Sequence, residues 1–192
     1  GLAIITRARF EEQHLAIQRR ILRGLLCELL GGAQRSFPRI EALVDAVASG
    51  HAGRRHLQSD LWYQVTADQL ILRRGAPRNL AIEVALPGRT EIGELGLALE
   101  VGLASNTDLE AIKAGLSAER AAFDADRVGR RLQLRSARPG DRFQPLGMSG
   151  RKRVSEFLID AGTPRILRDD VLLLTRGPEI VWVTGMRPAH PF

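Results

Sequence analysis

Positively charged side chains gather in residues 134–170, where their types and spacing suit the binding of phosphate groups. Eight Lys or Arg residues stand there against five Asp or Glu residues, and seven of the eight are Arg. The planar guanidinium of Arg can form two parallel hydrogen bonds to a phosphate. The candidate phosphate-binding residues are Arg135, Arg138, Arg142, Arg151, Lys152, Arg153, Arg165 and Arg168.

The local sequence predicts how the central cations are presented. Apolar residues within 154–161 recur with the spacing of one helical face, and Gly162 is placed to end that helix. With Ser149 as the N-cap, the cations at 151–153 would lie in the first helical turn. Cationic side chains there oppose the helix dipole, so a bound phosphate would satisfy both the cations and the unpaired backbone N–H groups.

Charge is distributed unevenly along the chain. Residues 1–60 and 125–192 carry formal net charges of +3 and +6, whereas residues 61–124 carry −3. A high Arg content caused by codon usage would not by itself segregate charge in this way. The basic balance of the last third indicates nucleic acid as a partner, and a solvated charged surface is the alternative interpretation.

Motifs that would support catalysis or metal binding are missing from the sequence. It has no G-x-x-x-x-G-K-[ST] loop and no G-x-G-x-x-G loop. Cys27, the sole cysteine, is interpreted as a core residue, and His51 and His56 lack the i, i+4 spacing of a helical metal pair. Asp124 and Asp126 fit a turn better than a carboxylate pair. We therefore predict no catalytic residue and no metal site in this chain.

Hydrophobic periodicity divides the chain into a helical part and a β-rich part. Residues 6–30 and 37–49 have helical periodicity. Strands are expected at 56–65, 69–74, 81–86, 95–101, 132–134, 171–174 and 180–183. We therefore expect an α+β fold: a helical hairpin domain over 1–74 that ends in a β-hairpin, then an α/β domain over 75–192 with a mixed sheet.

Composition is that of an ordinary globular protein. With 192 residues, 44% of them hydrophobic and 26% charged, the chain can bury a sizeable core. No apolar run reaches the roughly 18 residues of a membrane helix, and no signal peptide is visible, so we expect a cytoplasmic protein without membrane contact. The sequence starts at Gly1 rather than Met, and we expect it to be part of a longer protein.

About the last 70 residues resemble the tail of the tRNA(Ile)-lysidine synthases. The resemblance rests on four motifs in order: GDRF-x-PLG from Gly140, the basic segment at 151–153, AG-x-P from Ala161, and LRD from Leu167. The segments HLAIQRRILRGLL and IEALVDAV resemble, more weakly, the helical substrate-recognition domain of that family. ALPGRTEIGELGLALE resembles the strand pair that precedes the tail.

The resemblance implies a function and a fold. Family members use ATP and Mg²⁺ in an N-terminal domain with an S-G-G-x-D-S loop, adenylate the wobble cytidine of an isoleucine tRNA, and attach lysine. This sequence lacks that loop. The resemblance therefore implies the tRNA-recognition half of such a ligase, inactive alone and without a cofactor of its own. Its implied partners are tRNA and the ATP-binding domain, with a homodimer left open. The tail is similar in fold to a domain of the phenylalanyl-tRNA synthetase β-chain.

A structural or protein-interaction module is the alternative function. In that case the arginines would pair acidic side chains across an interface with a catalytic domain or a second copy. Other arginines could stabilise the fold, which applies to Arg135, Arg138 and Arg142 beside Asp141 or Asp124, and to Arg168 beside Asp169 or Asp170. Steep salt dependence of RNA binding separates the two functions.

Overall fold

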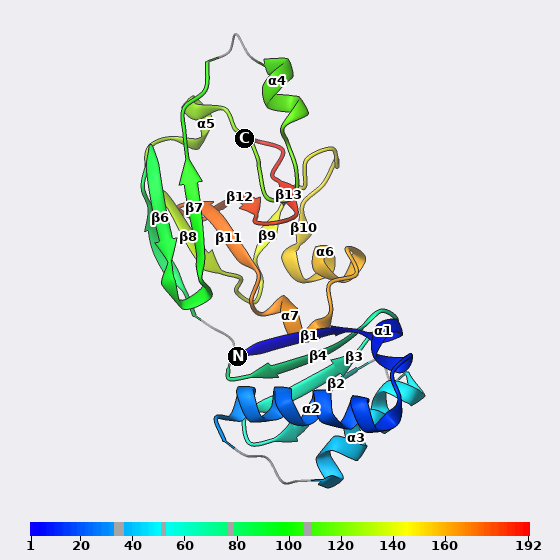
Figure 1. The fold of residues 1–192 in the computed structure, drawn as a ribbon. Helices are drawn as coiled ribbons and strands as arrows, with labels where there is room; N and C mark the ends of the chain where they lie inside the picture. The colour runs from blue at the N-terminus through cyan, green and yellow to red at the C-terminus, as the bar shows by residue number, and fades with distance from the viewer. Residues whose placement is uncertain (33–36, 51–52, 77–78, 106–108) are drawn as a thin grey trace. The chain divides into compact units, whose positions relative to one another are not determined.

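The chain forms two compact units (Figure 1). The computed structural model describes residues 1–32, 37–50, 53–76, 79–105 and 109–192. Unit 1 consists of Gly1–Pro77 together with Thr163–Arg168, and unit 2 of Arg78–Gly162 together with Asp169–Phe192. The expected division into domains over 1–74 and 75–192 concerns independent folding and stays a prediction.

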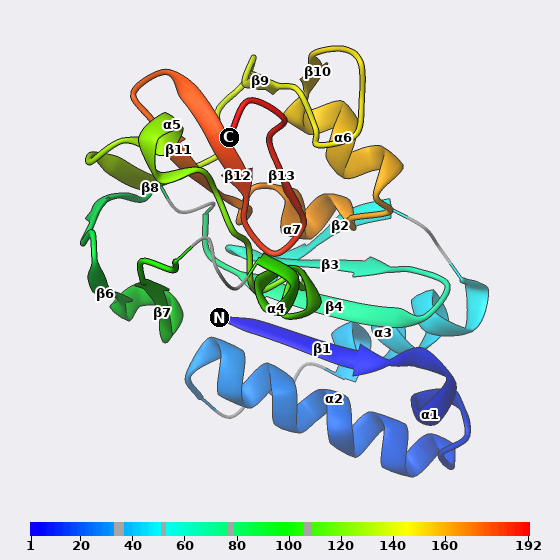
Figure 2. The ribbon, with the colours of Figure 1, turned by 90° about the horizontal axis from the view of Figure 1, so that it is seen from above.

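Unit 1 is built on a four-stranded antiparallel sheet in the order β1-β4-β3-β2. The strands are β1 (Leu2–Thr6), β2 (Gly53–Gln58), β3 (Leu61–Val65) and β4 (Gln69–Arg74). The helices that precede β2 are α1 (Arg7–Glu11), α2 (Leu15–Leu30) and α3 (Phe37–Ser49). α2 and α3 lie against one face of the sheet, where Leu22, Leu26 and Leu43 are buried with Leu61 and Leu70 (Figures 1 and 2).

Two of the expected elements at the beginning of the chain are wrong in their bounds, and one strand was not expected. The helix expected at 6–30 is two helices, because the chain turns at His14, whose Nδ1 accepts from the N–H of Ala16 at 3.3 Å. The strand expected at 56–65 is the hairpin β2–β3, which reverses at Ser59 with φ +43°. The unexpected strand is β1, which pairs with β4, about 70 residues later. In place of the expected helical domain, unit 1 therefore combines helices with an antiparallel sheet.

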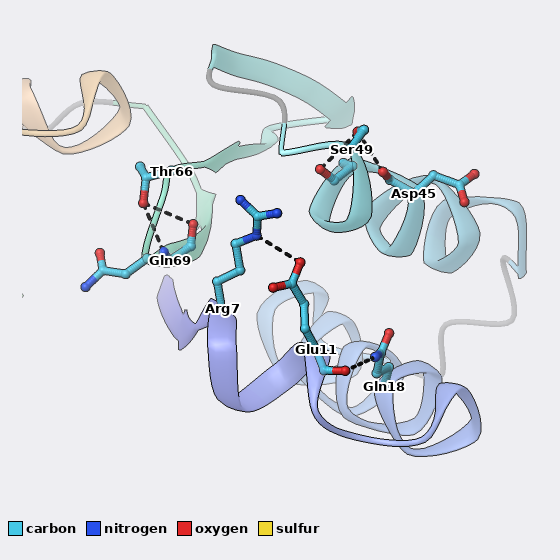
Figure 3. Close-up of polar contacts among 8 residues, drawn as sticks. Arg7, Glu11, Gln18, Asp45, Ser49, Thr66 and Gln69 are labelled. Carbon is cyan, nitrogen blue, oxygen red and sulfur yellow. Dashed lines mark hydrogen bonds and ion pairs between the residues drawn. The ribbon is translucent and has the colours of Figure 1, made fainter.

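Short-range polar contacts fix several turns of unit 1 (Figure 3). Arg7 Nε donates to the carboxylate of Glu11 one helical turn later, at 3.0 Å. Between β3 and β4 the hydroxyl of Thr66 accepts from the N–H of Gln69 at 3.0 Å, a local turn contact typical of Thr. The hydroxyl of Ser49 donates to a carbonyl one turn earlier in α3, at 2.7 Å. These contacts stabilise the turns through residues close in sequence.

A segment distant in sequence completes unit 1. The short helix α7 (Arg165–Arg168) lies against β3, on the face opposite α2 and α3 (Figure 1). The N–H of Ile166 donates to Gln64 Oε1 at 3.0 Å, and the carbonyl of Ile166 accepts from the guanidinium of Arg73 at 3.1 Å. All three residues are buried. Buried backbone groups need such partners, so Gln64 and Arg73 hold α7 on the sheet.

Replacing Ile166 with Ala is expected to lower the free energy of unfolding of unit 1 by about 2 to 5 kcal/mol, because truncation of a fully buried Ile leaves a cavity. Urea unfolding in a Trp182→Phe background measures this change, since Trp62 then reports on unit 1. Ile159→Ala, at an exposed position of unit 2, is the control and should cost under about 0.5 kcal/mol. Equal stability of both variants would show that Thr163–Arg168 does not stabilise unit 1.

Unit 2 contains a five-stranded sheet in the order β13-β12-β11-β8-β5. Its strands are β5 (Ala81–Val84), β8 (Leu132–Ser136), β11 (Leu172–Arg176), β12 (Glu179–Val183) and β13 (Arg187–Pro188). Two-stranded ribbons are formed by β6 (Gly88–Ile92) with β7 (Leu97–Val101) and by β9 (Arg142–Phe143) with β10 (Lys152–Arg153). The helices are η1 (Gly93–Leu95), α4 (Leu109–Ala114), α5 (Ala125–Val128) and α6 (Val154–Asp160).

Every pairing among the described strands of unit 2 is antiparallel, so the expected mixed sheet is wrong. The physical reason lies in the connections. β11 and β12 form a hairpin, and β8 runs antiparallel to both of its neighbours, β11 and β5. Two parallel neighbours would instead need a long crossover connection that returns the chain to run in the same direction. The chain is thus a mixed α and β protein with several antiparallel sheets, and the similarity to the phenylalanyl-tRNA synthetase domain stays a prediction.

An apolar cluster fixes β9 and α6, which flank the cations at 151–153, to the sheet of unit 2. Phe143 of β9 and Val154 and Leu158 of α6 are buried together with Leu173 and Val183 of the sheet. The expected helical face packs through Val154, Phe157 and Leu158, whereas Ala161, at its end, is exposed. This packing determines which side chains of β9, β10 and α6 face the solvent.

Candidate nucleic-acid interface

The ribbon β9–β10 presents arginines on one face. Arg153 is the direct cross-strand partner of Arg142, and Lys152 is the partner of Phe143. Because side chains alternate along a strand, Arg142 and Arg153 share one face of the ribbon. Phe143 is buried, whereas Arg142 and Arg153 are exposed. Burial of Phe143 thus directs the two arginines to the solvent.

A third arginine reaches the same ribbon. The guanidinium of Arg151 donates to the carbonyl of Arg142 at 3.3 Å, and its side chain is exposed. Arg142, Arg151 and Arg153 are called the ribbon arginines below. Like charges placed opposite each other in a sheet repel. The negative charge of Glu156 offsets the repulsion between Arg142 and Arg153 only in part. Its carboxylate lies 4.0 Å from Arg153 Nε, which is the outer limit of an ion pair.

The expectation that the cations at 151–153 lie in the first turn of a helix is wrong. α6 begins at Val154, Lys152 and Arg153 are paired in β10, and the N-cap is Arg153 rather than Ser149. The N–H of Val154 donates to the carbonyl of Asp141 at 2.9 Å. Pairing with β9 thus holds the cations in extended backbone, and the cross-strand arrangement of arginines replaces the helix start as the candidate anion site.

Lys152 is directed toward α6 rather than toward the ribbon arginines. Its ammonium forms an ion pair with Asp160 in the last turn of α6. The Lys152 side chain is 23% exposed, and that of Asp160 is 61% exposed. A phosphate would have to compete with this carboxylate, which makes Lys152 a weaker candidate than its neighbours.

Arg135 is a structural residue. Its guanidinium donates two hydrogen bonds of 2.8 Å to the two carboxylate oxygens of Asp141, and a third of 3.0 Å to the carbonyl of Ser136. The side chains of Arg135 and Asp141 are 7% and 15% exposed. Pairing with Asp141, the alternative raised by the sequence, is confirmed. The guanidinium is therefore not offered to a ligand in solvent.

The same carboxylate fixes the turn that leads into β9. The backbone N–H of Arg138 donates to Asp141 Oδ2 at 2.7 Å, while the Arg138 side chain is exposed. Burial opposes ionisation of Asp141. The hydrogen bonds from Arg135 and from the Arg138 backbone, with the charges of both arginines, outweigh burial and hold the pKa of Asp141 below its ordinary value. Asp141 therefore stays ionised and positions the ribbon.

Arg165 and Arg168 belong to unit 1. Arg165 is exposed on α7, and Arg168 is half-buried with its Nε donating to the carbonyl of Thr163 at 2.8 Å. The hydrogen bond from Arg168 to Thr163 closes the loop before α7. Neither residue is part of the unit 2 surface formed by the ribbon arginines.

Arg187 was missed by the sequence reasoning. It lies in β13, opposite Val183 of β12, and its side chain is exposed. The sequence gives no signal for β13, because a two-residue strand leaves no periodic pattern. Only the pairing with β12 places Arg187 beside α6.

Groups that could hold a metal ion are absent from the described residues: no three or more His, Cys, Asp or Glu side chains gather there. Asp124 is the N-cap of the short helix α5, and its Oδ1 accepts from the N–H of Asp126 at 3.0 Å. The two acids therefore stand at the start of a helix, where the sequence predicted a turn. Cys27 is half-buried in α2, and His51 lies outside the described residues. In the part of the chain that the structure describes, no helix is long and apolar enough to cross a membrane.

Comparison with known proteins gives consistent matches. Residues 132–190 match the family model described as the TilS substrate C-terminal domain. The tRNA(Ile)-lysidine synthase of Dehalococcoides mccartyi is 32% identical over 194 residues, which cover 96% of this chain and 40% of that protein. That of Caldanaerobacter subterraneus is 29% identical and covers 95% of this chain and 39% of that protein.

A shorter and more similar match involves the tRNA(Ile)-lysidine synthase of Symbiobacterium thermophilum, which is 40% identical over 103 residues, or 54% of this chain and 21% of that protein. The resemblance seen in the sequence is confirmed. The two relatives that match nearly all of this chain are much longer, and the chain spans about 40% of their length.

Proposed function

Because this chain is homologous to the tRNA(Ile)-lysidine synthases along nearly its whole length, with a TilS substrate C-terminal domain at 132–190, we propose that it is the tRNA-recognition part of such an enzyme. The complete enzyme would attach lysine to the wobble cytidine of an isoleucine tRNA. In this proposal, the present chain binds the tRNA and the remaining part of the protein performs the ATP-dependent chemistry.

The observation that carries the proposal is the cross-strand placement of Arg142 and Arg153 on a solvent-exposed face, with Arg151 bonded to the same ribbon. Phosphate oxygens between these guanidinium groups would relieve the repulsion of like charges and accept forked hydrogen bonds. Such contacts set the register of the RNA rather than read its bases. On a double-helical stem they would recognise shape, since side chains cannot enter the deep major groove of A-form RNA.

Two observations support placing ATP and Mg²⁺ in the remaining part of the protein. The sequence has no phosphate-binding loop, and the described residues include no group of three or more metal-ligating side chains. The proposal therefore assigns both to an ATP-binding domain outside the sequence and gives this chain no chemical step. Its own part is to hold the RNA.

Salt dependence of tRNA binding tests the proposal. Each phosphate contact releases condensed counterions, and the slope of log K against log salt is about −0.7 to −0.9 per phosphate. Three ribbon arginines give a slope of about −2 to −3, so affinity should fall about 15- to 65-fold between 50 and 200 mM salt. Fluorescence titration of a tRNA transcript at four salt concentrations measures the slope. No detectable binding, or a slope near zero, would contradict the proposal.

Contact with protein is the second candidate function, and the exposed apolar side chains of α2 favour it. Leu15, Ile17 and Ile21 are all exposed on this helix. In this alternative, unit 1 packs on the ATP-binding domain of the enzyme or on a second copy of the chain. Sedimentation velocity over a range of concentrations distinguishes a homodimer from a monomer.

A further inference from the structure

Unit 2 has an open depression of about 360 Å³ beside β10 and α6. Met148, Met186 and Phe157 supply its apolar wall, and both methionines of the chain are therefore in one place. Lys152, Asp160 and Arg187 supply its charged groups. Lys152 lies between two ribbon arginines in the sequence, so the depression and the arginine face share the strand β10.

The wall of the depression suits a flat aromatic ring. Thioether side chains make favourable contacts with aromatic rings and adapt to their shape. The ring of Phe157 is held in place by an edge-on contact with the buried Phe143, with ring centroids 5.2 Å apart. The volume lies within the range of small-molecule sites. An aromatic ligand would therefore meet a wall that is partly fixed before it binds.

The charged side chains of the depression indicate which kind of aromatic ligand it would bind. Lys152 and Arg187 outnumber the carboxylate of Asp160, so the rim favours a ligand attached to negative charge. The carboxylate of Asp160 is largely exposed and can accept a hydrogen bond from an amino group beyond its pairing with Lys152. A nucleobase with an exocyclic amino group, attached to a phosphate backbone, combines these properties.

We propose that the depression holds one unpaired nucleobase of the bound RNA. This inference rests on the proposed function, because the ribbon arginines would bring the RNA backbone to β10. A base in a paired stem keeps its faces stacked, whereas a base in a loop or at an end can leave the stack and lie against protein side chains. Adenine and cytosine, which carry amino groups, should bind better than uracil.

Two RNA hairpins with the same stem test the proposal, one blunt and one with a single-stranded overhang of adenosines. Base stacking on protein side chains contributes about 1 to 3 kcal/mol per base, and the depression is open, so we expect the overhang to raise affinity about five- to tenfold. An overhang with 2-aminopurine in place of one adenine should change its fluorescence on binding. A uridine overhang should give less than half of the gain in affinity.

Ala161→Trp is the variant that fills the depression. Ala161 lines it at the end of α6, is exposed, and has φ −73° and ψ 2°, which suits any L-residue. The variant should bind both hairpins with equal affinity, with an unchanged salt slope. Ile159→Trp adds the same ring to an exposed position of α6 that does not line the depression, and it should keep the preference for the overhang.

The outcomes separate this inference from the proposed function. Salt-dependent binding of both hairpins with equal affinity by the parent chain would overturn the base site and leave the proposed function standing. Absence of salt-dependent binding to either hairpin would overturn both. Tighter binding of a Glu- and Phe-containing peptide than of the overhang, lost in Ala161→Trp, would assign the depression to a protein partner. Should Ala161→Trp not fold, the overhang preference and 2-aminopurine fluorescence of the parent decide.

Discussion

Replacing Asp141 with Asn should lower the free energy of unfolding of unit 2 by about 3 kcal/mol. The substitution keeps the size of the side chain and removes its charge, which leaves the buried guanidinium of Arg135 without its carboxylate. Breaking a buried pair by changing one partner costs about 3 to 5 kcal/mol, and the partly exposed edge of Asp141 argues for the lower end. Urea unfolding at pH 7 measures the loss.

The same variant has a defined pH signature. The pKa of Asp141 is lowered in the folded chain, so its contribution to stability is fully present above the ordinary Asp pKa of about 3.9 and is lost as the pH falls through the folded value. The stability difference between parent and Asp141→Asn should therefore be constant from about pH 5 upward and shrink below about pH 4. Unfolding curves at pH 7, 5, 4 and 3.5 follow this difference.

Asp160→Asn is the matched control for Asp141→Asn. It removes the carboxylate of another ion pair in the same unit, but Asp160 is 61% exposed, and such pairs contribute about 0 to 1 kcal/mol. A loss of equal size in both variants would mean that burial of the Arg135 pair is not what makes it stabilising. If the stability difference between the parent and Asp141→Asn stays constant down to pH 3.5, the pKa of Asp141 is not lowered in the folded chain.

Elements determined by short-range patterns could be predicted from the sequence. The apolar periodicity expected over 6–30 contains α2, and the periodicity over 37–49 corresponds to α3. α6 ends at Asp160, two residues before the glycine that was expected to stop it. Gly162 has φ +70°, and its N–H donates to the carbonyl of Ile159 at 3.0 Å. A left-handed backbone at this position favours Gly for steric reasons, and the local sequence is sufficient to indicate it.

Elements determined by distant partners could not be predicted in the same way. β10 is only two residues long, and its strand conformation comes from pairing with β9 across an intervening loop. α7 is held by Gln64 and Arg73, about 100 residues earlier in the sequence. In neither case does a local pattern reveal the partner, because the stabilising contacts lie outside any window over which periodicity is read.

The candidate site shows the same limit. The sequence marked eight cations by their charge, and charge alone does not separate an arginine that pairs with Asp141 from one that faces the solvent. Burial makes that distinction: Arg135 is buried in an ion pair, and Arg142 is exposed because its neighbour Phe143 packs in the core. The alternation of buried and exposed side chains along β9 comes from its pairing with β10, and a two-residue strand is too short to show it as a pattern in the sequence.

Replacing the three ribbon arginines together with Ala should weaken tRNA binding about 10- to 150-fold at 50 mM salt. Each exposed ionic contact contributes about 0.5 to 1 kcal/mol, and three of them add to about 1.5 to 3 kcal/mol. The slope of log K against log salt should become shallower by about two to three units, because three phosphates are no longer neutralised. Fluorescence titration of a tRNA transcript at four salt concentrations measures both quantities.

The control for this variant must change the net charge equally. Arg120, Arg130 and Arg131 are three exposed arginines of unit 2 outside the ribbon, and their joint replacement with Ala also removes three positive charges. If the ribbon arginines contact phosphate directly, the control should keep most of the slope, whereas a purely long-range effect of charge would reduce the slope equally in both variants.

Unfolding free energies of the ribbon variant should stay within about 0.5 kcal/mol per substitution of the parent, since these side chains are exposed. Equal slopes in the ribbon variant and the parent would exclude the ribbon as the phosphate site and favour protein contact as the function of this surface.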